Sequence, residues 1–404
     1  MPAIQTDVLV IGGGLIGLAT AMHLQAMQPR LKISLCEKDN RVAAQQSGHN
    51  SGVLHAGIYY QPGSLKARLC VDGKQALVAF CERHAIPVIR CGKVIVANTA
   101  LESDQLERLH DRGTENGVPG LKILSQRELR DVEPHVRGRK ALHSPQSAIV
   151  DYQLVAAAYA KDFQAAGGQV HLETEFVSAG PLNSRRRVIT TREEFDARFV
   201  INCAGLQSDL VAKKMGTDPG LRIIPFRGEF LELSPARRHL VKGLIYPVPN
   251  PDLPFLGVHI TPMVSGSIEV GPNAILATRR EGYRRQDFSL QEFANTLSYP
   301  GFWRLIARNL GPGVAEIKRA LRKSVFVENA RQLVPDINAE DLRPLRAGVR
   351  AMAVGPDGNM IDDFRVEEAP GAIHVLNAPS PAATSSMMIG KYIAGKAELR
   401  INAD

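Results

Sequence analysis

The sequence is poor in aromatic residues and has no paired cysteines. Aromatic side chains make up 5% of the 404 residues, and the basic residues are spread along the chain, so nucleic acid is not an expected partner. No CxxC or HxxxH pair occurs, so no metal site is expected. An odd number of scattered cysteines is typical of a cytosolic protein with reduced thiols. The cysteines are Cys36, Cys70, Cys81, Cys91 and Cys203.

Long apolar runs are missing as well. No uninterrupted stretch reaches the ~18 apolar residues of a membrane-spanning helix. The first residues show neither the basic segment nor the cleavage site of a secretory signal. With 44% hydrophobic residues the chain can bury a large core, and its length favours two domains. Lys and Arg exceed Asp and Glu by eight (49 against 41), which favours anionic partners such as acidic metabolites, phosphates or anionic lipid.

The first forty residues carry a dinucleotide-binding pattern. The apolar run 7–11 is followed directly by Gly12, Gly14 and Gly17 in GxGxxG spacing, then by a helical segment and a second apolar run that ends in Glu37. The glycines allow a tight turn, a close approach of pyrophosphate and close helix–strand packing, while the helix N-terminus offers N–H groups to phosphate. Glu37 is placed to bind the adenosine ribose, which argues against a 2′-phosphate. The pattern alone does not distinguish NAD from FAD.

Nucleotide-fold features recur at the start, in the middle and at the end of the chain. The middle section has helical periodicity at 151–168 and a buried strand at 198–205. Residues 222–275 instead show short strands broken by Pro and Gly, which is typical of an antiparallel sheet. We therefore expect an α/β fold with an inserted α+β domain dominated by an antiparallel sheet. The expected cofactor domain comprises 1–85, 145–215 and 340–404, and the expected substrate domain comprises 86–144 and 216–339.

Four segments resemble one family of flavoproteins. They are SGHNSGVLHAGIYYQPGSLKARLC (47–70), PFRGEFLEL (225–233), GVHITP with VGPNA (257–274) and DDF with HVLNAPSPAATSS (362–386). With the glycine motif, they are similar to the L-2-hydroxyglutarate dehydrogenases/oxidases of the FAD-dependent D-amino-acid oxidase superfamily. The resemblance implies an FAD-binding Rossmann-like domain with non-covalent FAD. It also implies oxidation of L-2-hydroxyglutarate to 2-oxoglutarate by hydride transfer to flavin N5.

Two other classes of function stay open on the sequence. One is an amino-acid oxidase or a glycerol-3-phosphate dehydrogenase of the same fold. The other is a flavin-binding protein without turnover, although the dense polar set at 49–60 argues against it.

The resemblance also implies which residues contact FAD. The loop HNSG (49–52) has the glycine and small polar side chains that are needed to cross the pyrophosphate and the flavin. The turn APSPAATSS (378–386) would direct N–H groups toward the flavin N1–C2=O edge and stabilise negative charge there. The expected cofactor-binding residues are Gly12, Gly14, Gly17, Glu37, Lys38, Ser47, His49, Asn50, Ser51, Gly52, Val177, Gly205, Ala382, Ala383, Thr384 and Ser385.

Oxidation of a secondary alcohol requires a base for the hydroxyl proton. Histidine suits this role because its pKa lies near the working pH. His55 is the first candidate, and His49 and His259 are the alternatives. For each histidine, the competing interpretation is a hydrogen-bonded structural residue.

A five-carbon hydroxy diacid brings two carboxylates, which arginine binds in bidentate geometry. Arg350, in RAGVRAMAVGPDG, resembles the arginine that clamps a carboxylate in related amino-acid oxidases. Arg227, Tyr59 and Tyr60 are the other candidates for substrate binding.

Residues 278–323 contain ten Lys or Arg against four Asp or Glu, and they hold the only tryptophan, in PGFWRLIARNL. This segment predicts either an amphipathic helix at an anionic membrane surface or a helix that covers the substrate domain with a solvated basic face. The resemblance favours peripheral contact with the inner face of the membrane and electron transfer to membrane quinone. A soluble carrier and oxygen stay open as acceptors.

Overall fold

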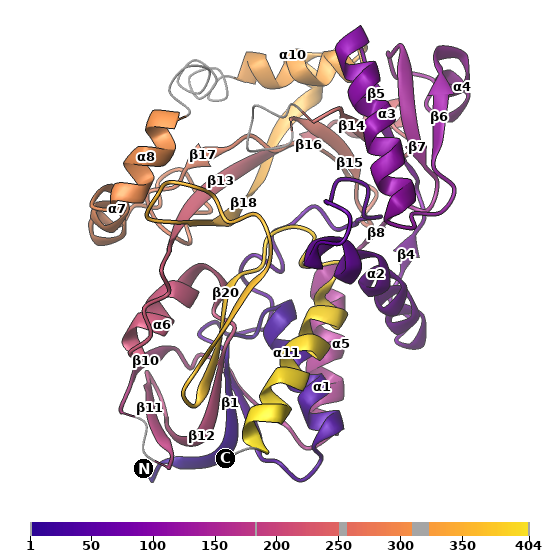
Figure 1. Ribbon diagram of the computed structural model, residues 1–404. Coiled ribbons are helices and arrows are strands. Elements are labelled where there is room, and N and C mark those ends of the chain that lie inside the picture. The colour runs from indigo at the N-terminus through magenta and orange to yellow at the C-terminus, as the bar shows by residue number, and fades with distance from the viewer. Residues whose placement is uncertain (1, 182–183, 250–256, 309–322, 403–404) are drawn as a thin grey trace.

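The computed structural model describes residues 2–181, 184–249, 257–308 and 323–402. They form two large sheets, which lie in the lower and upper halves of Figure 1, and one small sheet. Among these residues, no helix is long and apolar enough to cross a membrane.

The first sheet is the nucleotide-fold sheet. Its eight described strands are β1 (Ile4–Ile11), β2 (Ile33–Cys36), β9 (Gln169–His171), β10 (Phe176–Ala179), β11 (Arg186–Thr190), β12 (Glu194–Asn202), β19 (Arg365–Ala369) and β20 (Ala372–Asn377). The strands β9, β2, β1, β12 and β20 run parallel in that order, while β10, β11 and β19 add antiparallel pairs. The centre of β1 is buried on both faces, as the apolar run 7–11 predicts.

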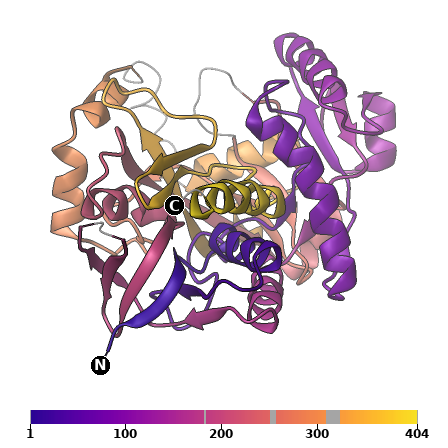
Figure 2. The same ribbon diagram turned by 60° about the horizontal axis from the view of Figure 1, so that its bottom comes forward.

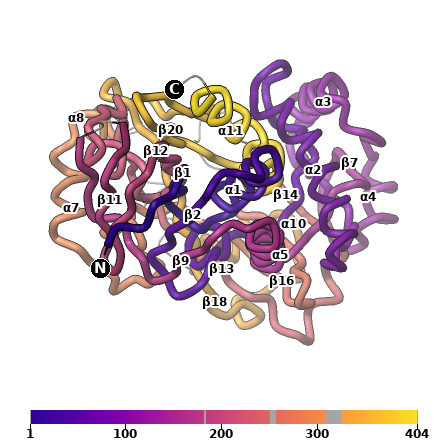
Figure 3. The backbone as a smooth tube through the Cα atoms, turned by 90° about the horizontal axis from the view of Figure 1, so that it is seen from below, coloured from indigo at the N-terminus to yellow at the C-terminus, as the bar shows by residue number. Residues whose placement is uncertain are grey.

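Long helices cover one face of this sheet. They are α1 (Leu15–Met27), α2 (Leu65–Arg83), α5 (Tyr152–Ala165) and α11 (Ser386–Ile401). Figures 2 and 3 both show α11 beside α1, and Figure 3 shows α5 on the other side of α1. A Cβ atom on Gly390 would lie 2.6 Å from the backbone of Ala19, so glycine is what lets α11 approach α1. On the opposite face, the short helix α6 (Ser208–Lys214) packs Val211 against the sheet.

The second sheet is mixed and contains nine described strands. They are β5 (Lys93–Ala97), β6 (Lys122–Ser125), β7 (Lys140–Ser144), β13 (Arg222–Leu233), β14 (Leu244–Pro247), β15 (His259–Pro262), β16 (Ile268–Gly271), β17 (Ile275–Leu276) and β18 (Leu342–Val354). All its pairs are antiparallel except β5 with β14, which is parallel. The predicted fold class is confirmed, with the refinement that the inserted sheet is mixed. A small sheet joins β3 (Val53–Leu54), β8 (Ala148–Val150) and β4 (Val88–Ile89).

Five further helices of the described residues belong to the part of the chain that contains the second sheet. They are α3 (Ala100–Glu115), α4 (Gln126–Val132), α7 (Leu290–Leu297), α8 (Pro300–Arg308) and α10 (Lys323–Leu333), with 3-10 turns at Gly205–Gln207, Pro235–Leu240 and Ala339–Asp341. The helix α8 covers most of PGFWRLIARNL, the part of segment 278–323 predicted as an amphipathic helix, and residues 309–322 lie outside the described part. It buries Phe302 and Leu305 against the sheet and leaves Trp303 54% exposed. Its apolar side therefore faces protein.

One predicted strand is broken in the structure. The sequence predicts a continuous strand at 169–177, but β9 ends at His171 and β10 starts at Phe176. Between them Glu173 has a φ of +54°, and the N–H groups of Glu173 and Thr174 donate to the carbonyls of Asp39 and Glu37. These bonds direct the chain across the end of β2.

The domain boundaries stay a prediction. The strand β18 hydrogen-bonds along its length to β13, although the sequence assigns 340–404 to the cofactor domain. This pairing favours a boundary after Val354.

A buried ion pair joins the helix α6 to the inserted sheet. Arg280 binds Asp209 through two nitrogens and also donates to the Leu206 carbonyl. The Asp209 carboxylate also accepts from the N–H of Leu210 and from the N–H of Ile223 in β13. The carboxylate side chain is fully buried and the guanidinium is 6% exposed, so neither charge has water as a substitute partner.

The first prediction concerns this pair. Asp209→Ala should lower the free energy of unfolding by about 3–5 kcal/mol, because it leaves a buried guanidinium without its carboxylate. A thermal melt should show a clear fall in Tm. Glu194→Ala is the control, since its pair with Arg187 is exposed and contributes about 0–1 kcal/mol. Equal melting temperatures for the two variants would contradict the prediction.

Candidate active site

A cavity of about 880 Å³ lies where the two large sheets meet. Its walls come from the β1–α1 turn, the loop 45–60, the end of β12 and the strands β13, β14, β15 and β18. The turn 375–383 before α11 closes it. Predicted residues that line it are Gly12, Gly14, Glu37, Lys38, Ser47, His49, Asn50, Ser51, His55, Tyr59, Tyr60, Gly205, His259, Arg350, Ala382 and Ala383. Predicted residues outside the lining are Gly17, Gly52, Val177, Arg227, Thr384 and Ser385.

The glycine turn fits a pyrophosphate. Gly12 has a φ of +107°, and a Cβ atom there would lie 2.5 Å from the Cys203 carbonyl oxygen. A Cβ atom on Gly17 would lie 2.0 Å from the Gly12 carbonyl oxygen. Gly14 caps α1 without a side-chain hydrogen bond, and the next N–H donates to the Ser47 hydroxyl at 3.0 Å. The first residues of α1 line the cavity, so the positive end of the α1 dipole lies beside it, as a phosphate site requires.

Glu37 lies at the end of β2, where the sequence places it. Its carboxylate accepts from the N–H of Gly13 at 2.6 Å and from the N–H of Asp39 at 2.9 Å. Burial raises the pKa of Glu37, and these two N–H donors oppose that rise. The neighbouring Lys38 forms an ion pair with Glu281, which also lines the cavity.

The loop after β2 is held by its own side chains. The Asn50 amide donates to the Ser47 carbonyl at 2.7 Å and accepts from the N–H of Gly52 at 2.9 Å. His49 Nδ1 lies 3.2 Å from the Ala347 carbonyl oxygen, and its ring lies 4.2 Å from that of Tyr283. Burial lowers the pKa of His49. These contacts engage Nδ1 and one face of the His49 ring.

The turn before α11 is tied to the same loop through Thr384. Its hydroxyl accepts from the N–H of His55 at 3.1 Å and lies within hydrogen-bond distance of the Val53 carbonyl and the Tyr152 hydroxyl. The predicted N–H donors are partly engaged already, because Ala382 and Ser385 donate to carbonyls inside the turn. Ala383 and Thr384 stay the proposed donors.

His55 and His259 both line the cavity. His55 Nδ1 is buried with no hydrogen-bond partner among the described residues, while Nε2 lies 3.4 Å from the Ser380 hydroxyl. His259 Nδ1 lies 3.0 Å from the Gly257 carbonyl oxygen. Burial lowers the pKa of His55 well below its usual value and that of His259 to about 3. Both imidazoles are therefore neutral and able to accept a proton.

Of the two arginines predicted as substrate ligands, Arg350 is the one that lines the cavity. It lies on β18 and lines the same wall as Tyr246. Burial lowers its pKa to about 10, so it stays charged at neutral pH.

Arg227 is not brought there, which corrects its prediction as a carboxylate ligand. Side chains alternate along β13, and Gly228 faces the cavity. Arg227 lies on the other face, where it donates to the Arg284 carbonyl and pairs with Glu229.

Val177 is also displaced from its predicted role. It is 41% exposed on β10, and the preceding residues 174–176 line the cavity instead. The break between β9 and β10 causes this shift, since it brings Thr174 across the end of β2.

Several cavity residues were not predicted from the sequence. Tyr246 stacks on His259 with ring centroids 4.1 Å apart, and Arg108, Arg112 and Lys66 line the mouth from α3 and α2. Arg108 and Arg112 are four residues apart, so on a helix they lie on the same face. This spacing could have indicated a positively charged face on α3.

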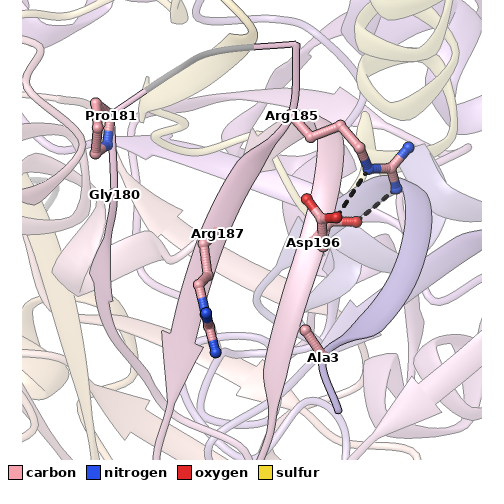
Figure 4. Close-up of a pocket in the computed structure, with 6 residues that line it drawn as sticks. All are labelled: Ala3, Gly180, Pro181, Arg185, Arg187 and Asp196. Atoms are coloured by element: carbon pink, nitrogen blue, oxygen red, sulfur yellow. Dashed lines mark hydrogen bonds and ion pairs between the residues drawn. The ribbon is translucent and has the colours of Figure 1, made fainter.

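A second cavity, of about 400 Å³, lies on the outer side of the first sheet (Figure 4). Arg185 and Asp196 line it and pair with each other, and Arg187 pairs with Glu194. Because its charges are matched, this cavity offers no group for chemistry.

Comparison with known proteins agrees with this geometry. The model of the family described as FAD dependent oxidoreductase matches residues 7–396. The chain belongs to this family. The prediction of FAD as cofactor is confirmed, and the glycine turn of this FAD dependent oxidoreductase fits a dinucleotide as described above.

Curated relatives confirm the resemblance carried by the four segments. The L-2-hydroxyglutarate dehydrogenase of Indibacter alkaliphilus is 46% identical, over 95% of this chain and 96% of the relative. That of Escherichia coli (strain K12) is 44% identical, over 97% and 93%. The human mitochondrial protein of the same name is 42% identical, over 98% and 89%.

Solved structures share the fold. The L-alpha-glycerophosphate oxidase from Mycoplasma pneumoniae, solved with FAD bound, superposes with a TM-score of 0.78 at 24% identity, over 98% of this chain and 94% of that chain. The glycine oxidase from Geobacillus kaustophilus gives 0.73 at 20% identity, over 98% and 95%.

The second prediction tests the glycine turn. Gly12→Ala should yield protein without bound flavin, because its Cβ atom would collide with the Cys203 carbonyl. The flavin absorbance of the purified protein measures this. Gly63→Ala is a matched control, since Gly63 also has a positive φ (+78°) but has nothing within 4 Å of an added Cβ atom. A yellow Gly12→Ala protein would count against the proposed site.

Proposed function

We propose that this protein oxidises L-2-hydroxyglutarate to 2-oxoglutarate. The observation that carries the proposal is the convergence of one charged arginine and two neutral histidines on one cavity of an FAD-dependent fold. The names of the curated relatives support the same substrate. When bound, FAD supplies the acceptor for the hydride that leaves the α-carbon.

Arg350 is proposed to hold the carboxylate next to the reacting carbon. Its guanidinium can bind a carboxylate through two parallel hydrogen bonds, which fixes orientation as well as affinity.

The second carboxylate is proposed to lie toward the mouth of the cavity. Tyr59 and Tyr60 line that side, and the Tyr59 hydroxyl is buried with no partner among the described residues. Arg108 and Arg112 add positive charge there, although Arg112 also donates to the Tyr59 carbonyl. A dicarboxylate would thus meet positive charge at both ends.

His55 is proposed to accept the hydroxyl proton. Its imidazole lines the cavity and is neutral, and its Nε2 lies near the Ser380 hydroxyl of the same cavity, so Nε2 is the nitrogen proposed to take the proton. His259 is the alternative base, because a proton held on Nδ1 by the Gly257 carbonyl leaves Nε2 as an acceptor.

The electron acceptor and the location of the protein in the cell are also part of the proposal. The family resemblance favours membrane quinone, with a peripheral contact from the segment around α8. The burial of Phe302 and Leu305 against the inserted sheet favours a helix that covers the protein instead. A membrane contact would therefore involve Trp303, which is half exposed.

The most direct experiment is an anaerobic absorbance titration of the yellow protein. L-2-hydroxyglutarate should bleach the flavin, while its D-enantiomer, amino acids and glycerol 3-phosphate should not. If only an amino acid or only glycerol 3-phosphate bleached the flavin, that compound would be the substrate instead of L-2-hydroxyglutarate. No bleaching by any of them would favour a flavin-binding protein without turnover.

The third prediction concerns Arg350. Arg350→Met should lower kcat/KM for L-2-hydroxyglutarate about 100-fold, as expected for losing a charged hydrogen-bonded partner, with FAD still bound. Steady-state kinetics at pH 8 measures this. Arg343→Met is the control, because Arg343 lies on the same strand β18 but is exposed. Unchanged kinetics in Arg350→Met would remove it from the carboxylate site.

The fourth prediction separates the two histidines. His55→Ala should slow flavin reduction in stopped flow about 100-fold or more, the usual contribution of a general base. His259→Ala should slow it less. The reverse order would assign the base to His259.

A further inference from the structure

A buried lysine lies behind the wall of the cavity. Lys93, on β5, is 2% exposed. Its Nζ lies 3.9 Å from the ring centroid of Tyr246 and 5.3 Å from that of Tyr59. Among residues 2–181, 184–249, 257–308 and 323–402, no carboxylate pairs with it, and no carboxylate contributes to the shift of its pKa. Its main compensation for burial is the faces of these two rings.

Packing does not explain a lysine at this position. The rest of β5 is the buried apolar run Val94–Ala97, so an apolar side chain would suit the strand. A buried ammonium disfavours its own charge. Burial accordingly lowers the pKa of Lys93 to about 7. A group that is costly to bury and lies beside a cavity is a candidate for function.

Lys93 is connected to both candidate bases. Tyr246, which it contacts, stacks on His259 at 4.1 Å, and Tyr59 lies on the same loop as His55. Its positive charge is one of the causes that lower the pKa of His55 and of His259, second to burial for His55.

We propose that Lys93 is a positioning residue whose charge keeps the imidazoles of His55 and His259 neutral, so that either can accept the substrate's hydroxyl proton. The proposal rests on the proposed function, because it assigns a role in that reaction. Lys93 does not line the cavity, so it acts through the field at the histidines rather than by touching the substrate.

The effect of Lys93 on the two histidines depends on pH, because Lys93 itself titrates. Below about pH 7, Lys93 is protonated and opposes a second positive charge on either histidine. The histidines therefore stay neutral in the acid range where an isolated imidazole would become protonated. Above about pH 7, Lys93 is neutral and has no such effect. Other titratable groups that face this cluster are Cys70 and Lys74 of α2, Cys91 before β5, and Arg350 of β18.

The experiment is the pH profile of kcat/KM for L-2-hydroxyglutarate between pH 4 and 9. Lys93→Met removes the charge and keeps the length of the side chain. Its acid limb should move up by about one pH unit. Since the pKa of His259 lies at about 3 in the wild type, kcat/KM should be about 2-fold lower than wild type at pH 4 and equal to it at pH 8.5. Lys93→Gln should behave in the same way if methionine is not tolerated. Lys93→Arg keeps a charge and should restore the wild-type acid limb.

Lys140→Met is the matched control. Lys140 lies on the neighbouring strand β7 of the same sheet, but it pairs with Glu107 at the surface. Its profile should coincide with that of wild type.

Two results would overturn the role of Lys93. One is a neutral variant with the wild-type profile, and the other is a neutral variant that loses activity equally at every pH, which a purely structural lysine would produce. Failure of the proposed function is separate, since wild-type protein would then not be reduced by L-2-hydroxyglutarate at any pH.

Discussion

The contact between the Gly12 turn and the Cys203 carbonyl is the constraint on which the cofactor end of the cavity depends. The strands β1 and β12 are parallel neighbours, with Ile11 opposite Asn202, so their carboxyl ends meet side by side. Only a hydrogen atom fits between the turn and that carbonyl. Parallel strands place their ligand site at this edge. The N-terminus of α1, the carboxylate of Glu37 and the turn at Gly205 consequently share one space.

Contacts between residues far apart in the sequence attach the loop 45–60 to the inserted sheet. Arg346 of β18 donates to the Asn50 carbonyl and pairs with Glu269. A Cβ atom on Gly348 would lie 2.5 Å from the His49 carbonyl oxygen, so the strand and the loop are in close contact. One loop therefore carries His49, for which a cofactor contact is proposed, and the base candidate His55.

The sequence predicts a site residue well when the residues that determine its position are close to it in the chain, and poorly when they are far away. The glycine turn and Glu37 are predicted because the pattern that indicates them lies within about 25 residues of chain. Arg227 is misplaced because the face of a strand depends on its register, and a shift by one residue reverses it. Lys93 is not predicted at all. Its approach to Tyr246 depends on the parallel pairing of β5 with β14, which places Lys93 opposite Leu244 from a distant part of the chain.

Burial lowers the pKa of three basic groups of the site, but by different amounts. It lowers the pKa of Arg350 to about 10, of Lys93 to about 7 and of His259 to about 3. At neutral pH the same low-dielectric environment thus contains a permanent positive charge, a partial one and a neutral imidazole. An anionic substrate needs the first for binding, and its hydroxyl needs the last as a proton acceptor. A nearby positive charge disfavours protonation of histidine. In the proposed site, the same positive charges therefore bind the carboxylate and keep the base neutral.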